Sequence, residues 1–214
     1  YIHDIEKQYE INITTELIII IIKYLDCLLN VGFDLNCPNK DYFNILTHKK
    51  VQAVGVDVNG NLLCSIDQVF TNELCNSFKI IFKATWTNPT SDYGSFFMIG
   101  YVTQPLDKSI KDWTKGLGYG NDEDEQEQYA FELSMNKDLS LQSNNESVIT
   151  PKSHTYCQHK SGDIFAMKYS FVTHTSELYQ NGKKLDLFFN HSSQTNIPMQ
   201  VIPVVNLHAL DNND

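Results

Sequence analysis

An acidic run and a histidine–cysteine cluster are the two segments whose side chains could bind a metal. The run Asp122–Glu125 offers carboxylates, the hard oxygen ligands that calcium prefers. An EF-hand loop that starts at Asp122 would need glycine at its sixth position, where Glu127 stands. We therefore interpret this run as a charged loop.

The second segment contains His154, Cys157 and His159. Tetrahedral zinc needs four ligands whose side chains converge. In an extended chain Cys157 and His159 share a face while His154 points to the other face, and no second pair such as CxxC is present. We expect a structural role for these residues, no metal site and no cofactor.

Motifs for nucleophilic or nucleotide chemistry are missing from the sequence. No GxSxG segment occurs, and Gly116–Gly120 matches neither the dinucleotide fingerprint nor the Walker loop. A catalytic triad whose members converge only in space stays open at this stage. We predict that the chain is not an enzyme, with a hydrolase as the less favoured alternative.

The charge of the chain excludes one class of partner and favours another. Its 16 basic residues are all lysines, and the net charge is −10. Nucleic-acid binders neutralise phosphates with basic patches and read bases with arginine, so we expect no nucleic-acid partner. An acidic surface favours a basic protein or peptide partner, with an affinity that salt weakens.

Cysteine usage and the first residues bear on the compartment. Five scattered cysteines give no disulfide framework, which indicates reduced thiols and a cytoplasmic setting. The chain opens without an initiator methionine or a signal-like segment, so we expect a fragment of a longer protein. The aliphatic run Leu17–Ile22 is too short to span a bilayer, which needs about 20 apolar residues.

Residues 1–31 are predicted to form an α-helical extension, and residues 32–214 the main domain. Thr14 is a candidate N-cap, and apolar residues recur at helical spacing from Leu17 to Leu28. This helix would pack on the main domain or on a partner.

After Gly32 the apolar period changes from helical to twofold. Phe78–Trp86 alternates strictly, with Phe78, Ile80 and Phe82 on one face, as in an antiparallel sheet with one buried and one wet face. We also expect a hairpin through Asn59-Gly60 and a central strand at Phe96–Val102. Later strands are predicted at Tyr129–Leu133, Ile164–Phe171, Ser176–Gln180, Lys184–Phe189 and Val201–Leu207. Short strands without intervening helices predict an all-β antiparallel sandwich.

Two segments interrupt this pattern. Asn121–Gln128 and Asn136–Ser147 are polar and are interpreted as solvated loops. Aromatic side chains in or near predicted loops can either pack the ends of the core or anchor a partner. The candidate partner-binding residues are Tyr93, Tyr101, Trp113, Tyr119 and Tyr156.

Two motifs near the C-terminal end lie close together in sequence. Gly162-Asp163-Ile164 begins a strand, and Leu178–Lys183 contains an Asn-Gly pair. Both central residues of a type I′ turn need positive φ, which Asn and Gly tolerate, so Asn181-Gly182 predicts a tight hairpin.

These motifs, with Phe97–Val102 and the closing strand Ile202–Leu207, resemble the SPRY family in order and spacing. The segment Lys115–His159 matches poorly, and Ser170 stands where the family commonly has an acidic residue. The resemblance implies a bent two-sheet sandwich, a monomeric domain without catalytic activity, whose loops bind a peptide or a protein.

Residues from Ile13 to Asp26 also resemble the first helix of an F-box, which implies an adaptor that links a target to a ubiquitin ligase. The main competing function is a carbohydrate-binding, lectin-like sandwich, because aromatic platforms with Asn and Asp side chains are present.

Overall fold

The computed structural model describes residues 32–34, 43–47, 49–53, 61–85, 95–103, 127–134, 138–143, 153–194 and 197–208. The chain divides into two compact units, Tyr1–Gly32 and Phe33–Asp214. The helical extension expected at residues 1–31, with its F-box-like segment, lies outside the described residues. Within the described ranges, no helix has the length and apolarity needed to cross a bilayer.

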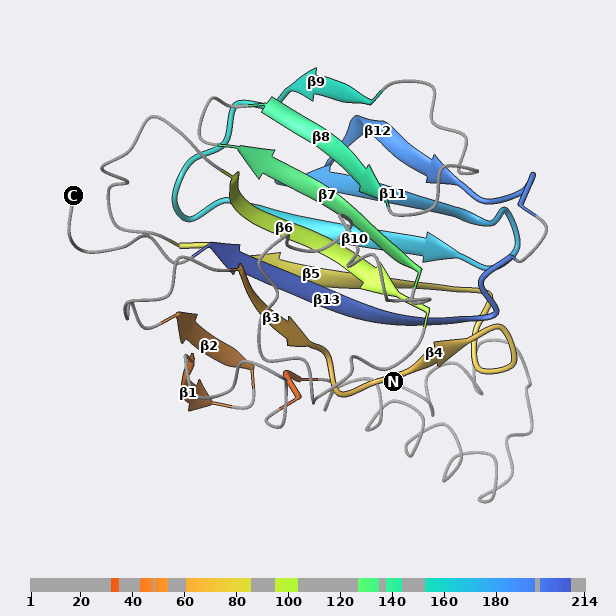
Figure 1. Ribbon diagram of the computed structural model, residues 1–214, viewed down its shortest axis with the longest axis horizontal. Helices are drawn as coiled ribbons and strands as arrows, with labels where there is room; N and C mark the ends of the chain where they lie inside the picture. Colours follow the sequence, from red (N-terminus) through yellow and green to blue (C-terminus); the bar gives the residue numbers. More distant parts are fainter. Residues whose placement is uncertain are drawn as a thin grey trace, which may run out of the picture. The chain divides into compact units, whose positions relative to one another are not determined.

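The described strands of the second unit form two main antiparallel sheets and a small hairpin (Figure 1). The larger sheet has the order β3 (Asn61–Ser65), β13 (Gln200–His208), β6 (Ser95–Val102), β7 (Gln128–Ser134), β8 (Asp138–Ser143) and β9 (His154–Tyr156), and β4 (Phe70–Thr71) also pairs with β13. The smaller sheet has the order β12 (Lys183–Asn190), β11 (Thr175–Gln180), β10 (Ile164–Ser170) and β5 (Ser77–Lys83). The hairpin pairs β1 (Phe43–Thr47) with β2 (Lys50–Ala53).

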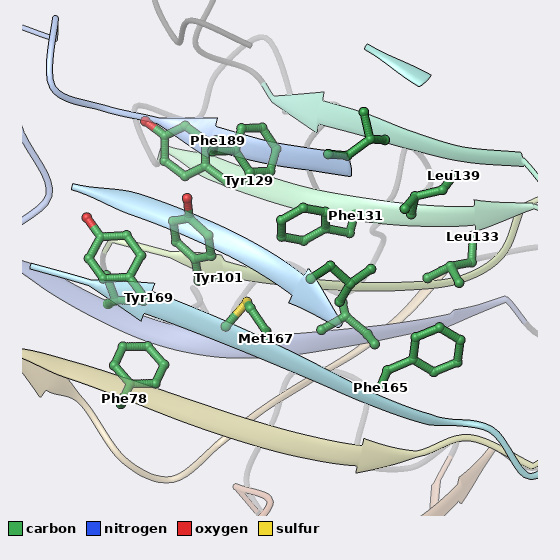
Figure 2. Close-up of a cluster of buried hydrophobic side chains, with 14 of the residues drawn as sticks. Phe78, Tyr101, Tyr129, Phe131, Leu133, Leu139, Phe165, Met167, Tyr169 and Phe189 are labelled. Atoms are coloured by element: carbon green, nitrogen blue, oxygen red, sulfur yellow. The ribbon is translucent and has the colours of Figure 1, made fainter. Parts of the chain in front are cut away.

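One apolar core lies between the two sheets. Alternate residues of β6 and β7 face alternate residues of β10 and β12, as Figure 2 shows for Tyr101, Phe131, Met167 and Phe189. Because strands of both sheets contribute to this core, the sheets pack face to face. The all-β sandwich predicted from alternation is therefore confirmed for the described part of the chain.

The larger sheet is also buried on its other face where β3, β13, β6 and the start of β7 lie side by side. Met98 and Val102 of β6 form a second apolar cluster with Ala130 of β7 and with Ile202 and Val204 of β13. Burial on both faces explains why Phe96–Val102 is apolar without strict alternation, as expected of a central strand.

Most predicted strands have the expected positions. β5 places Phe78 in the core with Ile80 and Phe82 against it, while Lys79 and Lys83 are exposed. Trp86 and the first half of the hairpin predicted at Asn59-Gly60 lie outside the described residues. The loop predicted at Asn136–Ser147 is wrong over Asp138–Ser143, which forms β8 between β7 and β9.

The predicted tight turn joins β11 to β12. Asn181 and Gly182 have φ angles of 49° and 83°, and Gln180 pairs with Lys183 across the turn. Positive φ at both central residues is the requirement of a type I′ turn, so this prediction is confirmed.

Candidate functional site

A buried polar network joins the two sheets at one end of the core. His191, directly after β12, lies 2.5 Å from the Tyr101 hydroxyl through Nε2 and 2.6 Å from Gln194 Oε1 through Nδ1. Tyr101 also contacts Ser176 Oγ at 3.0 Å, and Gln194 Nε2 donates to the Tyr129 hydroxyl at 3.1 Å. Figure 2 shows the hydroxyl groups of Tyr101 and Tyr129 at the same end of the core.

The hydrogen bonds of this network fit a neutral imidazole. Gln194 Oε1 can only accept, so His191 Nδ1 donates to it, and Nε2 is left to accept from the Tyr101 hydroxyl. Burial lowers the pKa of His191 to about 4, since a charged ring would lose its hydration. Burial likewise raises the pKa of Tyr101 well above its usual value.

The network has the residue types of a proton relay, namely Ser176, Tyr101 and His191. These residues have no access to a substrate. All three side chains have 0% exposed surface. A general base must reach the proton that it removes, directly or through one water. The network instead fixes the end of the sandwich and the chain segments that leave it.

Three turns converge at this end, which we call the loop end: residues 67–76, 171–174 and 197–199. Asn72 N donates to Met199 O at 3.2 Å, and Phe171 N donates to Asn76 O at 2.9 Å. The pairing of β4 with β13 and of β5 with β10 brings these distant segments together (Figure 1). Each turn carries at least one exposed aliphatic side chain, and the set is Val69 (36% exposed), Leu74 (54%), Val172 (67%) and Met199 (56%).

The turn between β10 and β11 is fixed from several sides. Thr173 N donates to Ser170 Oγ, and the Thr173 and Thr175 hydroxyls are 2.8 Å apart. His174 has a φ of 52°, a left-handed conformation that few residues other than glycine adopt, and its carbonyl accepts from His191 N at 2.8 Å. Because the backbone is fixed, Val172 is presented to solvent in one arrangement, which lowers the entropic cost of binding.

The described charged residues of the three turns are acidic. Asp67 and Glu73 are exposed on the first turn, and the described residues of all three turns include no lysine. Glu127 lies beside the network and accepts from the Tyr129 hydroxyl at 3.1 Å. The loop end is therefore acidic over its described residues.

The Gly-Asp and Asn-Gly motifs bind each other at the opposite end of the smaller sheet. The Asp163 carboxylate accepts from Asn181 Nδ2 at 3.0 Å, Gln180 Nε2 at 2.8 Å and Lys160 N at 2.9 Å. Burial alone would raise the pKa of Asp163, but these hydrogen bonds outweigh it and the pKa is lowered. This cluster stabilises the hairpin, and both oxygens of its carboxylate accept hydrogen bonds from within the chain.

A polar face covers β7, β8 and β9 on the side away from the core. Glu132 is buried, and its Oε2 accepts from Gln142 Nε2 at 2.6 Å and from Ser140 Oγ at 3.2 Å. His154 is exposed beside Ser140, and Tyr156 of the same strand is 66% exposed. Glycosidases of the usual kind use two carboxylates across the scissile bond. On the described part of this face, Glu132 is a buried carboxylate, and Asp138, which pairs with Tyr156, is an exposed one.

The histidine–cysteine cluster is structural. Cys157 is buried and its thiol donates to Gln180 Oε1 at 3.4 Å, while His159 Nε2 contacts Ser134 O at 2.8 Å. Burial, with the nearby Asp163 carboxylate, raises the pKa of Cys157 to about 11, so the thiol is a poor nucleophile at neutral pH. Among the residues described, no group of three or more His, Cys, Asp or Glu side chains could hold a metal ion.

The five predicted partner-binding residues have different outcomes. Tyr101 has no exposed surface, so its expected contact with a partner is wrong: its ring packs the core and its hydroxyl binds His191. Tyr156 is exposed on β9, at the edge of the larger sheet. Three of the predicted residues lie outside the described residues, namely Tyr93, Trp113 and Tyr119, and so do Gly116–Gly120 and the acidic run Asp122–Glu125. Thr103 and Glu127, the described residues on either side of residues 104–126, are hydrogen-bonded at the loop end.

Sequence comparison finds no family and no curated protein that match this chain. Comparison of structures does find similar folds. The SPRY domain of human HERC1 is 12% identical and has a TM-score of 0.52, over 84% of this chain and 92% of that chain. The PSpry domain of TRIM65 is 16% identical, with a TM-score of 0.50 over 85% of this chain and 88% of that chain.

The chain shares its β-sandwich fold with these two SPRY domains. Peanut lectin with a bound nine-residue peptide aligns over 83% of this chain and 82% of its own length, with 12% identity and a TM-score of 0.47. At these identities the similarity concerns the fold alone, and function has to be argued from the surfaces of this chain.

Proposed function

We propose that this chain is a non-catalytic protein-interaction module that binds a basic peptide segment or protein through the loop end. The observation that carries the proposal is the fixed turn at residues 171–174, which presents Val172 at the same end of the sandwich as the turns that carry Met199 and Leu74. Its fold likeness to two SPRY domains is consistent with this class.

The energetic reasoning is that of a small anchor site. Apolar anchors on a fixed backbone lose little freedom on binding, so more of the free energy of their burial contributes to affinity. The carboxylates of Asp67 and Glu73 on the first turn would orient a basic partner and increase its association rate at low salt.

The test is a binding measurement with a matched control. The partner is first isolated from the source cell with the whole chain and purified, and its affinity is then measured by calorimetry. The double variant Val172→Asp and Met199→Asp should bind at least tenfold more weakly, a loss of about 1.4 kcal/mol or more. Leu46→Asp, at an exposed apolar residue of the β1–β2 hairpin, should bind as the parent chain does.

Carbohydrate binding remains the second candidate, and one observation favours it. The polar face of β7, β8 and β9 combines Glu132, Ser140 and Gln142 with the exposed ring of Tyr156. Sugar sites in β-sandwiches use such a combination of hydrogen-bonding groups and an aromatic ring. Binding on a glycan array that Tyr156→Ala abolishes and Val172→Asp preserves would favour this candidate over protein binding.

A further inference from the structure

The outer face of the smaller sheet differs in charge from the rest of the chain. Lysines project from three of its four strands, and two carboxylates accompany them, which gives this face a charge of 4 − 2 = +2 in a chain of net charge −10. The charged residues of the face are Lys79, Lys83, Lys168, Lys184, Glu177 and Asp186.

Part of this charge is engaged within the face. Lys184 Nζ binds Glu177 Oε1, and the Lys79 ammonium lies 4.4 Å from the centre of the Tyr179 ring. Burial would raise the pKa of Glu177, but its hydrogen bonds from Lys184 and Tyr179 outweigh this and the pKa is lowered. Lys83 and Lys79 on β5 keep their ammonium groups accessible to a ligand, since both residues are exposed.

Two exposed aliphatic side chains lie among these lysines. Ile81 of β5 is 66% exposed and is flanked along the strand by Lys79 and Lys83. Ile164 of β10 is 46% exposed and pairs directly with Lys83. Lysine on an edge strand commonly prevents pairing with other chains. A large exposed isoleucine between two lysines instead favours such pairing, because its apolar surface is buried when another strand covers it.

β5 is also an edge strand. In the part of the chain that the structure describes, Ser77–Lys83 pairs with β10 on one side and with no strand on the other (Figure 1). An extended peptide can add to such an edge through main-chain hydrogen bonds, while its alternate side chains give specificity. On the outer face, those side chains would stand opposite Lys79, Ile81 and Lys83.

We propose that the edge of β5 and the lysine-rich outer face form a second binding surface, which takes an extended acidic segment of a partner protein. The complementary pattern is acidic, any, aliphatic, any, acidic, because carboxylates then face the two lysines and the aliphatic side chain covers Ile81. This surface is separate from the loop end, so either proposal can fail without the other.

The probe is a peptide with the core Glu-Thr-Val-Thr-Glu, titrated into the isotopically labelled whole chain and followed by NMR. We expect the amide signals of Ser77–Lys83 to shift on binding. The double variant Lys79→Glu and Lys83→Glu should weaken binding at least tenfold, whereas Lys49→Glu with Lys50→Glu, at two exposed lysines of the β1–β2 hairpin, should leave it unchanged. A peptide N-methylated along its backbone should not bind, because it cannot donate to β5.

Three results would overturn the proposal. Equal binding by the Lys79/Lys83 variant and the parent chain would show that the lysines have no role. Equal binding of the N-methylated peptide would remove strand addition. A concentration-dependent dimer in sedimentation analysis that the Lys79/Lys83 variant abolishes would identify a second copy of this chain as the occupant.

Discussion

The buried imidazole of His191 should make the stability of this protein depend on pH in a defined window. The ring is neutral in the folded state, where its pKa is about 4 instead of the ordinary 6.5. Between these two values the unfolded chain binds a proton that the folded chain does not. Stability therefore decreases as pH falls from about 6.5 to about 4 and gains nothing from this group above pH 7.

The magnitude follows from the two pKa values. At 1.36 kcal/mol per pKa unit, the complete effect is roughly 3 kcal/mol, of which about 2 kcal/mol is lost between pH 7 and pH 5. For a chain of this length, that loss lowers the melting temperature by roughly 4–8 °C.

The assay is urea unfolding of the parent chain and of His191→Gln at pH 7 and pH 5. The variant cannot titrate at this position, so the stability difference between the two proteins should shrink by about 2 kcal/mol at pH 5. His154→Gln, which replaces an exposed imidazole on β9, is the matched control and should keep the parent's pH dependence. If His191→Gln does not fold, imidazole nitrogen shifts measured by NMR in the parent report the titration directly. Parallel pH dependence of parent and variant, or a His191 that titrates near 6.5, would refute the reasoning.

Two further predictions concern the hairpin and its carboxylate. Gly182→Ala should cost about 1–2 kcal/mol of unfolding free energy, because Gly182 has a φ of 83°. No atom lies within 4 Å of the new methyl group, so the substitution measures backbone strain alone. An unchanged denaturation midpoint would contradict this prediction. Asp163→Asn should cost about 2–4 kcal/mol of unfolding free energy at pH 7, because three donors lose a charged acceptor. This loss relative to the parent should shrink as pH falls below the ordinary carboxyl pKa of 3.8 and Asp163 of the parent becomes protonated. Equal losses at pH 7 and pH 2.5 would argue against the assigned role.

Alternation predicted the fold well wherever one face of a strand is buried. The pattern of Phe78, Ile80 and Phe82 fixed the orientation of β5, and Asn181-Gly182 fixed the turn between β11 and β12. Both signals are local, because side-chain direction and φ preference depend on residues adjacent in sequence.

The same rule could have corrected two errors. Tyr101 follows Phe97 and Ile99 at a spacing of two, so it shares their buried face, and its aromatic character alone suggested a binding role. β8 was missed because the Asn- and Ser-rich composition of its surroundings obscured the alternation of Leu139 and Leu141.

Other features depend on contacts between distant residues. His191 continues the inward positions of Leu187 and Phe189, so its burial was predictable, but its partners Tyr101 and Gln194 come together only through strand pairing and the sandwich. Likewise, Leu74, Val172 and Met199 are brought to one end by the pairing of β4 with β13 and of β5 with β10, which alternation does not specify.

The most direct test of the central claim is the affinity of the purified partner for the chain with its loop end altered. We predict that Val172→Asp with Met199→Asp weakens this affinity at least tenfold while the circular dichroism spectrum and the melting temperature stay those of the parent. Leu46→Asp, on the β1–β2 hairpin, should bind normally. Undiminished binding by the folded loop-end variant would contradict the assignment of this surface as the partner site.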